Sequence, residues 1–425
     1  MSARSTHKVF SGALQFTVLI GVVIALLLMA LMMLQNTQNF FEDQSKSAIN
    51  NIQLANSGIN YALGDNSFTS DTLTLPYLGS ETQSVKVNLS LWGIFDLANV
   101  RATHRKKVFN QCALIGSQTR INNKAALYLQ DNNKSLAIAG RASLNGTIYL
   151  PGQGIKPGYV NGESYNNQQL YHGIAKRSKP TMPRLEKIYE RDLRQFIAKK
   201  HDYNRLISTD NPLKLANSFT DRTKTIFSTG PIELSQRSLT GNIIIQSDFL
   251  IRVKNTSLLN DVILLAPVIE IEDGVVGNFQ AIATRSITVG ENCKLNYPSA
   301  LVLLQESSVN VSPGNTTEYQ IRIAKKSEIF GSVCFLKSII GNDFKVQLLV
   351  SDEVVVKGEV YCQGNLELRG KVIGSVTTEQ FIVNEQGTLL INYIYNGEIM
   401  ESGRPETFCG LRMEDAFKGI AKWMY

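Results

Sequence analysis

Residues 356–376 read VKGEVYCQGNLELRGKVIGSV, and the pattern in this stretch decides the fold that we expect. A glycine, one further residue and a valine recur at Gly358-Glu359-Val360, Gly370-Lys371-Val372 and Gly374-Ser375-Val376, and upstream at Gly331-Ser332-Val333. Apolar and polar residues alternate over only a few positions, which is typical of short strands with one buried face. Such strands, separated by turns and without helical periodicity, predict a β-solenoid or a β-sandwich.

The same pattern extends towards the N-terminus, where short apolar groups follow one another with turns between them. Examples are Val262-Ile263-Leu264, the pair Ile269 and Ile271, and Ile287-Thr288-Val289. We therefore expect a mainly β protein whose central domain is a right-handed parallel β-helix, or solenoid, over residues 121–396. A sandwich stays open as the alternative, because the glycine motifs are unevenly spaced.

Two helices should accompany this domain. Pro183 opens a helical insertion near residues 183–201, where apolar residues recur at the spacing of one helix face. That face consists of Leu185, Ile188, Tyr189, Leu193, Phe196 and Ile197. Residues 397–425 are expected to form a C-terminal cap with a short helix, because apolar residues recur there at a similar spacing. They are Leu411, Met413, Phe417, Ile420 and Trp423.

The N-terminal part predicts a membrane anchor. Residues 1–12 form a polar leader with Arg4 and Lys8, and residues Ala13 to Leu34 are then almost entirely apolar. At a rise of ~1.5 Å per residue, such a helix reaches about 33 Å, which is enough to span a lipid bilayer. Basic residues precede the span and Glu42 follows it, so the positive-inside rule places the N-terminus in the cytoplasm. We expect a single-pass protein of the inner (cytoplasmic) membrane with a periplasmic or extracellular C-terminal domain.

The helix should continue beyond the membrane to about residue 66. Apolar residues follow a helical stripe from Ala48 to Leu63, and no proline interrupts the chain before Pro76. Residues 67–120 then carry strand signals at 73–77, 85–95 and 100–115, and we interpret them as a β-rich adaptor before the β-helix domain.

This N-terminal arrangement resembles that of type IV pilin-like proteins, in particular PilX-like minor pilins and the tip pseudopilins of type II secretion. The resemblance rests on the basic leader, Gly12, the apolar helix that starts at Ala13 and the amphipathic extension. It implies that a prepilin peptidase cuts between Gly12 and Ala13. The fifth residue of the mature chain would be Thr17, where most of this family has Glu, although tip pseudopilins also lack that Glu. An uncleaved signal anchor stays open as the alternative.

The strand region resembles two further groups. Residues 356–360 and 368–376 are similar to the coils of bactofilins, which are polymer-forming β-helical proteins without catalytic residues. Carbohydrate-active β-helix proteins are the second group, and their parallel strands present charged residues along a groove.

The net charge of the chain indicates only a weak attraction to anionic partners. The formal net charge is +7 over 425 residues, and the basic residues are spread out. We see no nucleic-acid-binding motif and expect no nucleic-acid partner. One local cluster is a candidate contact for an anionic polymer, and a solvated strand or turn is the alternative interpretation. It consists of Arg101, His104, Arg105, Lys106 and Lys107.

The five cysteines do not predict a zinc site, because none of them shows CxxC spacing. Cys334 and Cys362 follow glycine motifs at similar offsets, so they could stack on adjacent coils. Two buried small apolar side chains are the simpler interpretation.

No catalytic set emerges from the sequence. The four histidines are isolated, and no HExxH or GxSxG motif occurs. Glu270, Glu272 and Asp273 are the best candidates for a glycosidase-like carboxylate pair, but an ordinary polar face explains them as well. Lys325, Lys326 and Arg285 are candidate bases for a lyase without a supporting motif.

We therefore expect a membrane-anchored structural or assembly protein without enzymatic activity, cofactor or metal. Its partners would be the bilayer and proteins of an envelope assembly, such as a pilus-like or secretion apparatus. The alternative is a membrane-tethered β-helix protein that binds or degrades a polysaccharide.

Overall fold

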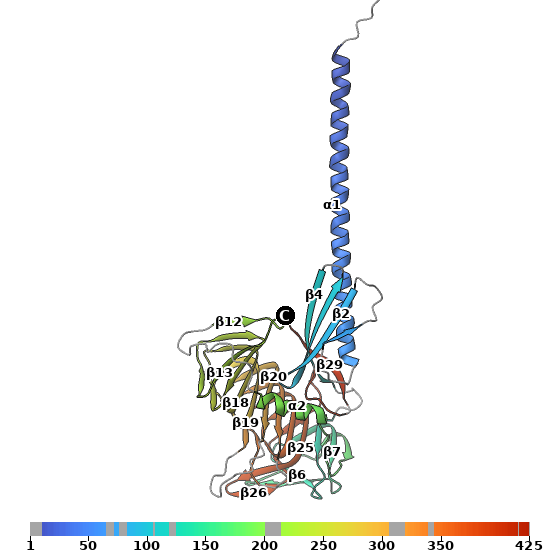
Figure 1. Cartoon of the computed structure of the whole chain (residues 1–425). Coiled ribbons are helices and arrows are strands. Elements are labelled where there is room, and N and C mark those ends of the chain that lie inside the picture. The colour runs from blue at the N-terminus through green and yellow to red at the C-terminus, as the bar shows by residue number, and fades with distance from the viewer. Residues whose placement is uncertain are drawn as a thin grey trace, which may run out of the picture. The chain divides into compact units, whose positions relative to one another are not determined.

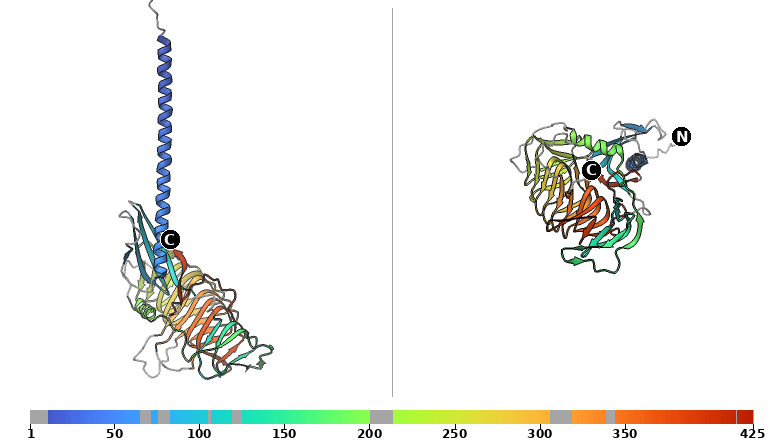
Figure 2. Two further views of the ribbon diagram at one scale, coloured as in Figure 1. Left: turned by 90° about the vertical axis from the view of Figure 1, so that its right-hand side faces the viewer. Right: turned by 90° about the horizontal axis from the view of Figure 1, so that it is seen from below.

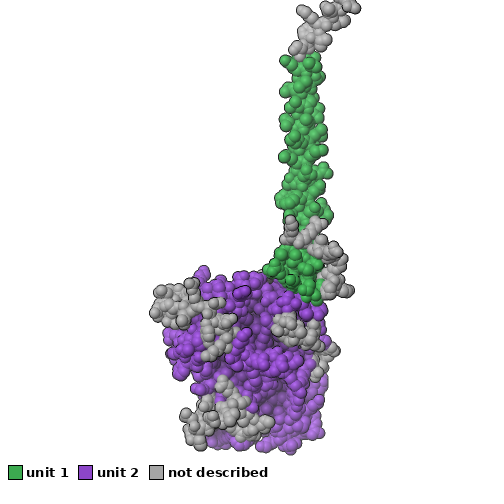
Figure 3. Space-filling view, viewed as in Figure 1, with its two compact units in different colours: residues 1–58, 74–86, 101–110 green, residues 59–73, 87–100, 111–425 purple. Residues whose placement is uncertain are grey.

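The computed structural model describes residues 11–64, 72–75, 83–104, 107–118, 125–199, 214–305, 319–338, 344–414 and 416–424. The chain divides into two compact units (Figure 3). Unit 1 comprises residues 1–58, 74–86 and 101–110, and unit 2 comprises residues 59–73, 87–100 and 111–425.

One long N-terminal helix, α1 (Ser11–Gly64), contains the apolar run (Figure 1). It is long and apolar enough to cross a membrane, and the side chains of its most apolar part are not buried against the protein. The predicted continuation of the helix beyond Leu34 is confirmed. Of the predicted stripe, Ala55, Ile59 and Ala62 are buried, whereas Ile49 and Ile52 are exposed.

A five-stranded sheet follows in the order β1-β2-β3-β4-β29. Its strands are β1 (Leu73–Leu75), β2 (Gln83–Trp92), β3 (Phe95–His104), β4 (Lys107–Gln118) and β29 (Phe417–Met424). The expected C-terminal helix is therefore wrong, because residues 417–424 pair antiparallel with residues 112–118 of β4. Gly419 lies in the middle of this segment, where it weakens a helix, and β4 offers a row of backbone partners.

Most of unit 2 is a set of parallel strands that we call the parallel stack. Its hydrogen-bonded order closes on itself. The strands are β5 (Leu127–Leu129), β7 (Ser143–Leu150), β11 (His172–Arg177), β12 (Lys214–Asn217), β13 (Lys224–Ser228), β14 (Ile232–Leu234), β15 (Ser238–Gly241), β16 (Ile243–Ser247), β17 (Leu250–Val253), β18 (Leu258–Ile271), β19 (Val276–Val289), β20 (Lys294–Leu304), β21 (Gln320–Ile323), β22 (Glu328–Leu336), β23 (Leu348–Val350), β24 (Val355–Leu368), β25 (Lys371–Glu385) and β28 (Glu398–Met400). The prediction of a mainly β chain with one long N-terminal helix is confirmed.

Short strands flank the stack. β6 (Leu136–Ala139) pairs in parallel with β27 (Tyr393–Tyr395) and β8 (Ile155–Pro157). Two antiparallel pairs join β9 (Tyr159–Val160) with β10 (Glu163–Ser164), and β25 with β26 (Thr388–Ile391).

The order of strands in the stack differs from their order in the chain. From β12 to β25, each turn of the chain pairs in parallel with the turn before it (Figure 2). Beyond β25, however, the next partners are β28 and the much earlier β5. β7 and then β11 follow. Residues 127–177 come early in the predicted β-helix of residues 121–396, but they lie next to the last turns of the stack.

Inward-facing aliphatic residues form columns through the stack. One column in register runs from Leu239 through Leu259, Gly277, Leu295, Ile329, Val356, Val372 and Ile399 to Leu144. Apart from Gly277, which has no side chain, these residues bury their side chains, and burying a Leu, Ile or Val stabilises a fold by roughly 1.5–3 kcal/mol. The period-2 alternation in the sequence is the pattern that places one such residue in each turn of the stack, which we call a coil.

Three of the four Gly-x-Val glycines stack on one another. Gly331, Gly358 and Gly374 are in register, with φ of 151°, 150° and 146°. A Cβ on Gly358 would lie 2.0 Å from the carbonyl oxygen of Gly331, so the column admits no side chain. Gly370 does not belong to this column, because it lies in the turn before β25.

A second apolar core lies on the outer face of the stack. Helix α2 (Lys187–Ala198) places Tyr189 and Leu193 there, which confirms the predicted helical insertion. The turn between β2 and β3 is held by the amide of Gln280: its nitrogen donates to the Trp92 carbonyl (3.1 Å), and its oxygen accepts from the Ile94 N–H (2.8 Å).

Cys334 and Cys362 do not face each other. In the register of β22 and β24, Cys334 pairs with Tyr361, and Cys362 pairs with Phe335. Cys334 therefore belongs to the outer core and Cys362 to the inner one. All five cysteines are free and buried, so the interpretation as small apolar side chains is the one that fits.

Replacing Gly358 by alanine should lower the free energy of unfolding by about 1–3 kcal/mol through backbone strain alone. The clash of the new Cβ with the Gly331 carbonyl oxygen should add to this loss. Chemical unfolding of the full chain in detergent, followed by circular dichroism, measures this loss. Gly154→Ala is the matched control, since Gly154 has φ +69° but open space around it. Equal losses in the two variants would contradict the stacked column.

Candidate functional site

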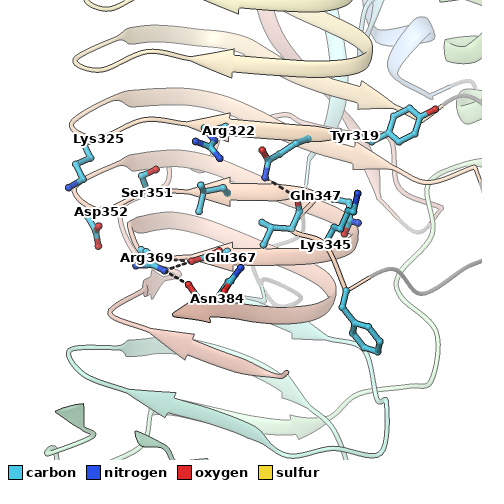
Figure 4. Close-up of a pocket in the computed structure, with 14 residues that line it drawn as sticks. Tyr319, Arg322, Lys325, Lys345, Gln347, Ser351, Asp352, Glu367, Arg369 and Asn384 are labelled. Carbon is cyan, nitrogen blue, oxygen red and sulfur yellow. Dashed lines mark hydrogen bonds and ion pairs between the residues drawn. The ribbon is translucent and has the colours of Figure 1, made fainter. Parts of the chain in front are cut away.

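A groove of about 540 Å³ on the outer side of the stack bears several charged side chains, and we call it the outer groove (Figure 4). It crosses β21, β23 and the ends of β24 and β25. Its lining residues are Tyr319, Gln320, Arg322, Lys325, Phe344, Lys345, Val346, Gln347, Leu349, Ser351, Asp352, Glu367, Arg369 and Asn384.

The register of the stack brings these residues together. Arg322 is aligned with Leu349, and Leu349 with Glu367, so three consecutive coils each contribute one outward side chain. Inward neighbours on both sides, such as Ile321 and Ile323, are buried in the core. The alternation that builds the core therefore also fixes which residues face the groove.

One side of the groove is an ion cluster of one arginine and two glutamates. The Arg369 guanidinium lies 2.5 Å from Glu367 and 2.6 Å from Glu385, and Arg369 also donates to the Asn384 carbonyl. Burial raises the pKa of the Glu367 carboxyl, and the neighbouring Arg369 opposes this shift. Arg369 thus has carboxylate partners within the protein and has little charge left for a ligand.

Three other cations of the groove differ from Arg369. Arg322, Lys325 and Lys345 are exposed, and within the described part of the chain no ion pair engages them. Figure 4 places Lys325 at one end of the groove, Arg322 near its middle and Lys345 at the other end. The groove can therefore attract an anionic ligand along its length.

The candidate carboxylate pair is engaged in ion pairs. Glu270 lies 2.7 Å from Arg252, and Glu272 lies 2.6 Å from Lys254. Asp273 accepts a hydrogen bond from the Glu291 N–H at 2.7 Å. Glu270 and Glu272 belong to a surface ladder of alternating charge, and this arrangement does not present a free acid and base to a substrate.

Of the three candidate lyase bases, the structure brings only Lys325 to the outer groove, and Lys326 and Arg285 do not line it. Arg322, Lys345 and Arg369 were missed by sequence reasoning. No motif marks them, and only the register of distant strands places them together. Among the residues that the structure describes, no group of three His, Cys, Asp or Glu side chains could hold a metal ion.

The predicted basic cluster of residues 101–107 lies in and between β3 and β4. Arg101 is exposed, whereas His104 shares a hydrogen bond with Gln83 at 3.1 Å. Lys107 donates to the side chain of Gln44 on α1, so it ties the hairpin to the helix. Arg105 and Lys106 lie outside the described residues. The contact with an anionic polymer stays a prediction.

Gly12 and Ala13, the candidate cleavage position, both lie in the first turn of α1. A Cβ on Gly12 would meet no atom within 4 Å, and Ala13 is exposed. The structure leaves cleavage at this position as a prediction.

A buried ion cluster joins three distant segments of unit 2. Arg412 lies 3.1 Å from Asp96 and also forms an ion pair with Glu186, and the side chains of Arg412 and Asp96 are 3% and 1% exposed. Burial raises the pKa of Asp96 to about 7, although Arg412 opposes the shift. The sequence gives no signal of this cluster, because its members are far apart in the chain.

No family model matches the chain, and neither a curated protein nor a solved structure is significantly similar to it.

Replacing Arg412 by methionine should lower the free energy of unfolding by about 3–5 kcal/mol near pH 8, because two carboxylates then lose their buried cation. The loss should shrink near pH 5. Asp96 has a higher pKa in the folded state than in the unfolded state, about 7, so its buried carboxyl is mostly protonated in the folded protein at pH 5. A neutral Asp96 does not need the cation, so removing Arg412 then costs less.

Unfolding of the full chain at both pH values measures this effect. Arg191→Met is the matched control, because Arg191 forms an exposed pair with Asp192 and should change stability by less than about 1 kcal/mol. A loss for Arg412→Met that is equal at pH 5 and pH 8 would argue against a buried charge cluster.

Proposed function

We propose that the protein is a membrane-anchored, extracytoplasmic and non-catalytic structural or assembly protein. The observation that carries this proposal is α1, one unbroken helix of 54 residues. Its N-terminal part is apolar and exposed, as a bilayer span requires, and its C-terminal part includes residues buried against the protein. The same helix can thus span the membrane and anchor the β-rich part of the chain to it.

We further propose that the parallel stack is a right-handed β-helix. The parallel pairing of successive turns from β12 to β25 supports this proposal. Connections between parallel strands of one sheet are right-handed in nearly all known cases. A scaffold of this kind presents its outward side chains in fixed columns and does not need a large conformational change to do so.

In the proposed orientation, α1 spans the inner (cytoplasmic) membrane and the N-terminus lies in the cytoplasm. Arg4 and Lys8 precede the apolar run and Glu42 follows it, which favours this topology. The role of a minor component in a pilus-like or secretion apparatus is part of the proposal. The pilin-like arrangement of leader, apolar helix and amphipathic extension supports that role.

Protease treatment of right-side-out spheroplasts tests the topology, with the full chain tagged at either end. We expect the protease to remove a C-terminal tag and to leave an N-terminal tag intact in the membrane fraction. The variant Arg4→Glu/Lys8→Glu is the control and should shift part of the population to the opposite orientation. A protected C-terminal tag in the wild type, or a chain in the soluble fraction, would refute the proposal.

Cross-linking in native membranes tests the assembly role. We expect the chain to appear in covalent adducts with other envelope proteins. A chain that forms no adducts with other proteins at any cross-linker concentration would refute that role while leaving the anchor intact.

A further inference from the structure

We propose that the outer groove is a binding site for an acidic polysaccharide with widely spaced negative charges, and that Arg322, Lys325 and Lys345 bind its carboxylates. This site adds to the scaffold role and does not depend on it. Its volume of about 540 Å³ lies in the range of ligand sites, which is roughly 300–1,000 Å³.

The arrangement of the three cations points to an elongated ligand. Arg322 and Lys325 are three residues apart, which corresponds to roughly 10 Å of extended chain. Lys345 lies on the other side of Arg322, four residues before Leu349, with which Arg322 is aligned. A single small anion would require cations that converge on one point, whereas these three follow a line along the strand direction.

The carboxylates of the groove favour a sparsely charged ligand. Glu367 is only 7% exposed and is held by Arg369, and Asp352 also lines the groove. A nucleic acid carries a negative charge on every nucleotide, so phosphates would also lie between neighbouring cations and close to these carboxylates. A polysaccharide in which charged sugars alternate with neutral ones avoids this repulsion.

The remaining lining residues suit sugar rings. Asp352, Ser351 and Asn384 offer oxygen or nitrogen atoms that can exchange hydrogen bonds with hydroxyl groups. Tyr319 and Phe344 add aromatic surface, and Phe344 is 52% exposed. Aromatic rings of this kind can pack against the apolar face of a sugar. Leu349 lies between the charged coils and forms part of the recess.

Binding of a fluorescent hyaluronan oligosaccharide to the full chain in detergent, measured by anisotropy, tests the proposal. Hyaluronan has a carboxylate on every second sugar. We expect saturable binding at low salt that weakens as the ionic strength rises, because the three cations are exposed. Neutral dextran should not bind.

The variant Arg322→Gln/Lys325→Gln/Lys345→Gln should weaken binding by about tenfold or more, since exposed ionic contacts each contribute a factor of roughly two to five. The matched control is Lys214→Gln/Arg222→Gln/Lys224→Gln, which removes the same charges from exposed positions in and near β12 and β13. This control should bind like the wild type. Both variants alter exposed side chains, and their unfolding curves should match.

A second variant separates the shape of the groove from its charge. Leu349→Trp fills the recess without changing the charge, and we expect it to weaken hyaluronan binding as well. Three results would overturn the proposal: no binding of hyaluronan to the wild type, equal losses in the two charge variants, or tighter binding of oligothymidylate or polyglutamate that the groove variant abolishes.

Discussion

The parallel pairing of β25 with β28 and with β5 is the contact on which the rest of unit 2 depends. A stack of parallel strands leaves a row of unpaired N–H and C=O groups at its last turn, and such an edge is costly to bury and prone to aggregate. Here a segment from an earlier part of the chain pairs with that edge. Residues 127–150 extend the stack beyond β25, and β11 continues it.

This closure determines the path of the C-terminal segment. After β28, Glu401 accepts a hydrogen bond from the Thr147 N–H, and the backbone of Gly410 then pairs with Ser117. That path delivers Arg412 to the buried contact with Asp96 and ends in β29 beside β4. Segments from both ends of the chain, together with α2, therefore cover one outer face of the stack. The outer groove and its exposed cations lie outside that covered core.

The sequence predicted the features that depend on local patterns. The apolar span and its helical continuation, the inward alternation around Ile287 and the insertion at α2 follow from spacing alone. The pairing of Leu127 with Val376 could not be predicted, because register between distant segments depends on long-range packing. The outer groove depends on the same kind of register, so its residues carry no sequence motif. The C-terminal strand was mistaken for a helix because its partner β4 lies about 300 residues earlier.

Cross-linking between Ser143 and Glu398 tests the closure most directly. These residues are in register on β7 and β28, and the native cysteines are all buried. We expect dibromobimane to bridge the variant Ser143→Cys/Glu398→Cys rapidly in the full chain. Ser143→Cys/Lys371→Cys should bridge poorly, because Lys371 lies one coil further away, at roughly 10 Å. Equal bridging of both pairs, or no bridging of the first, would contradict the pairing of β7 with β28 that extends the stack.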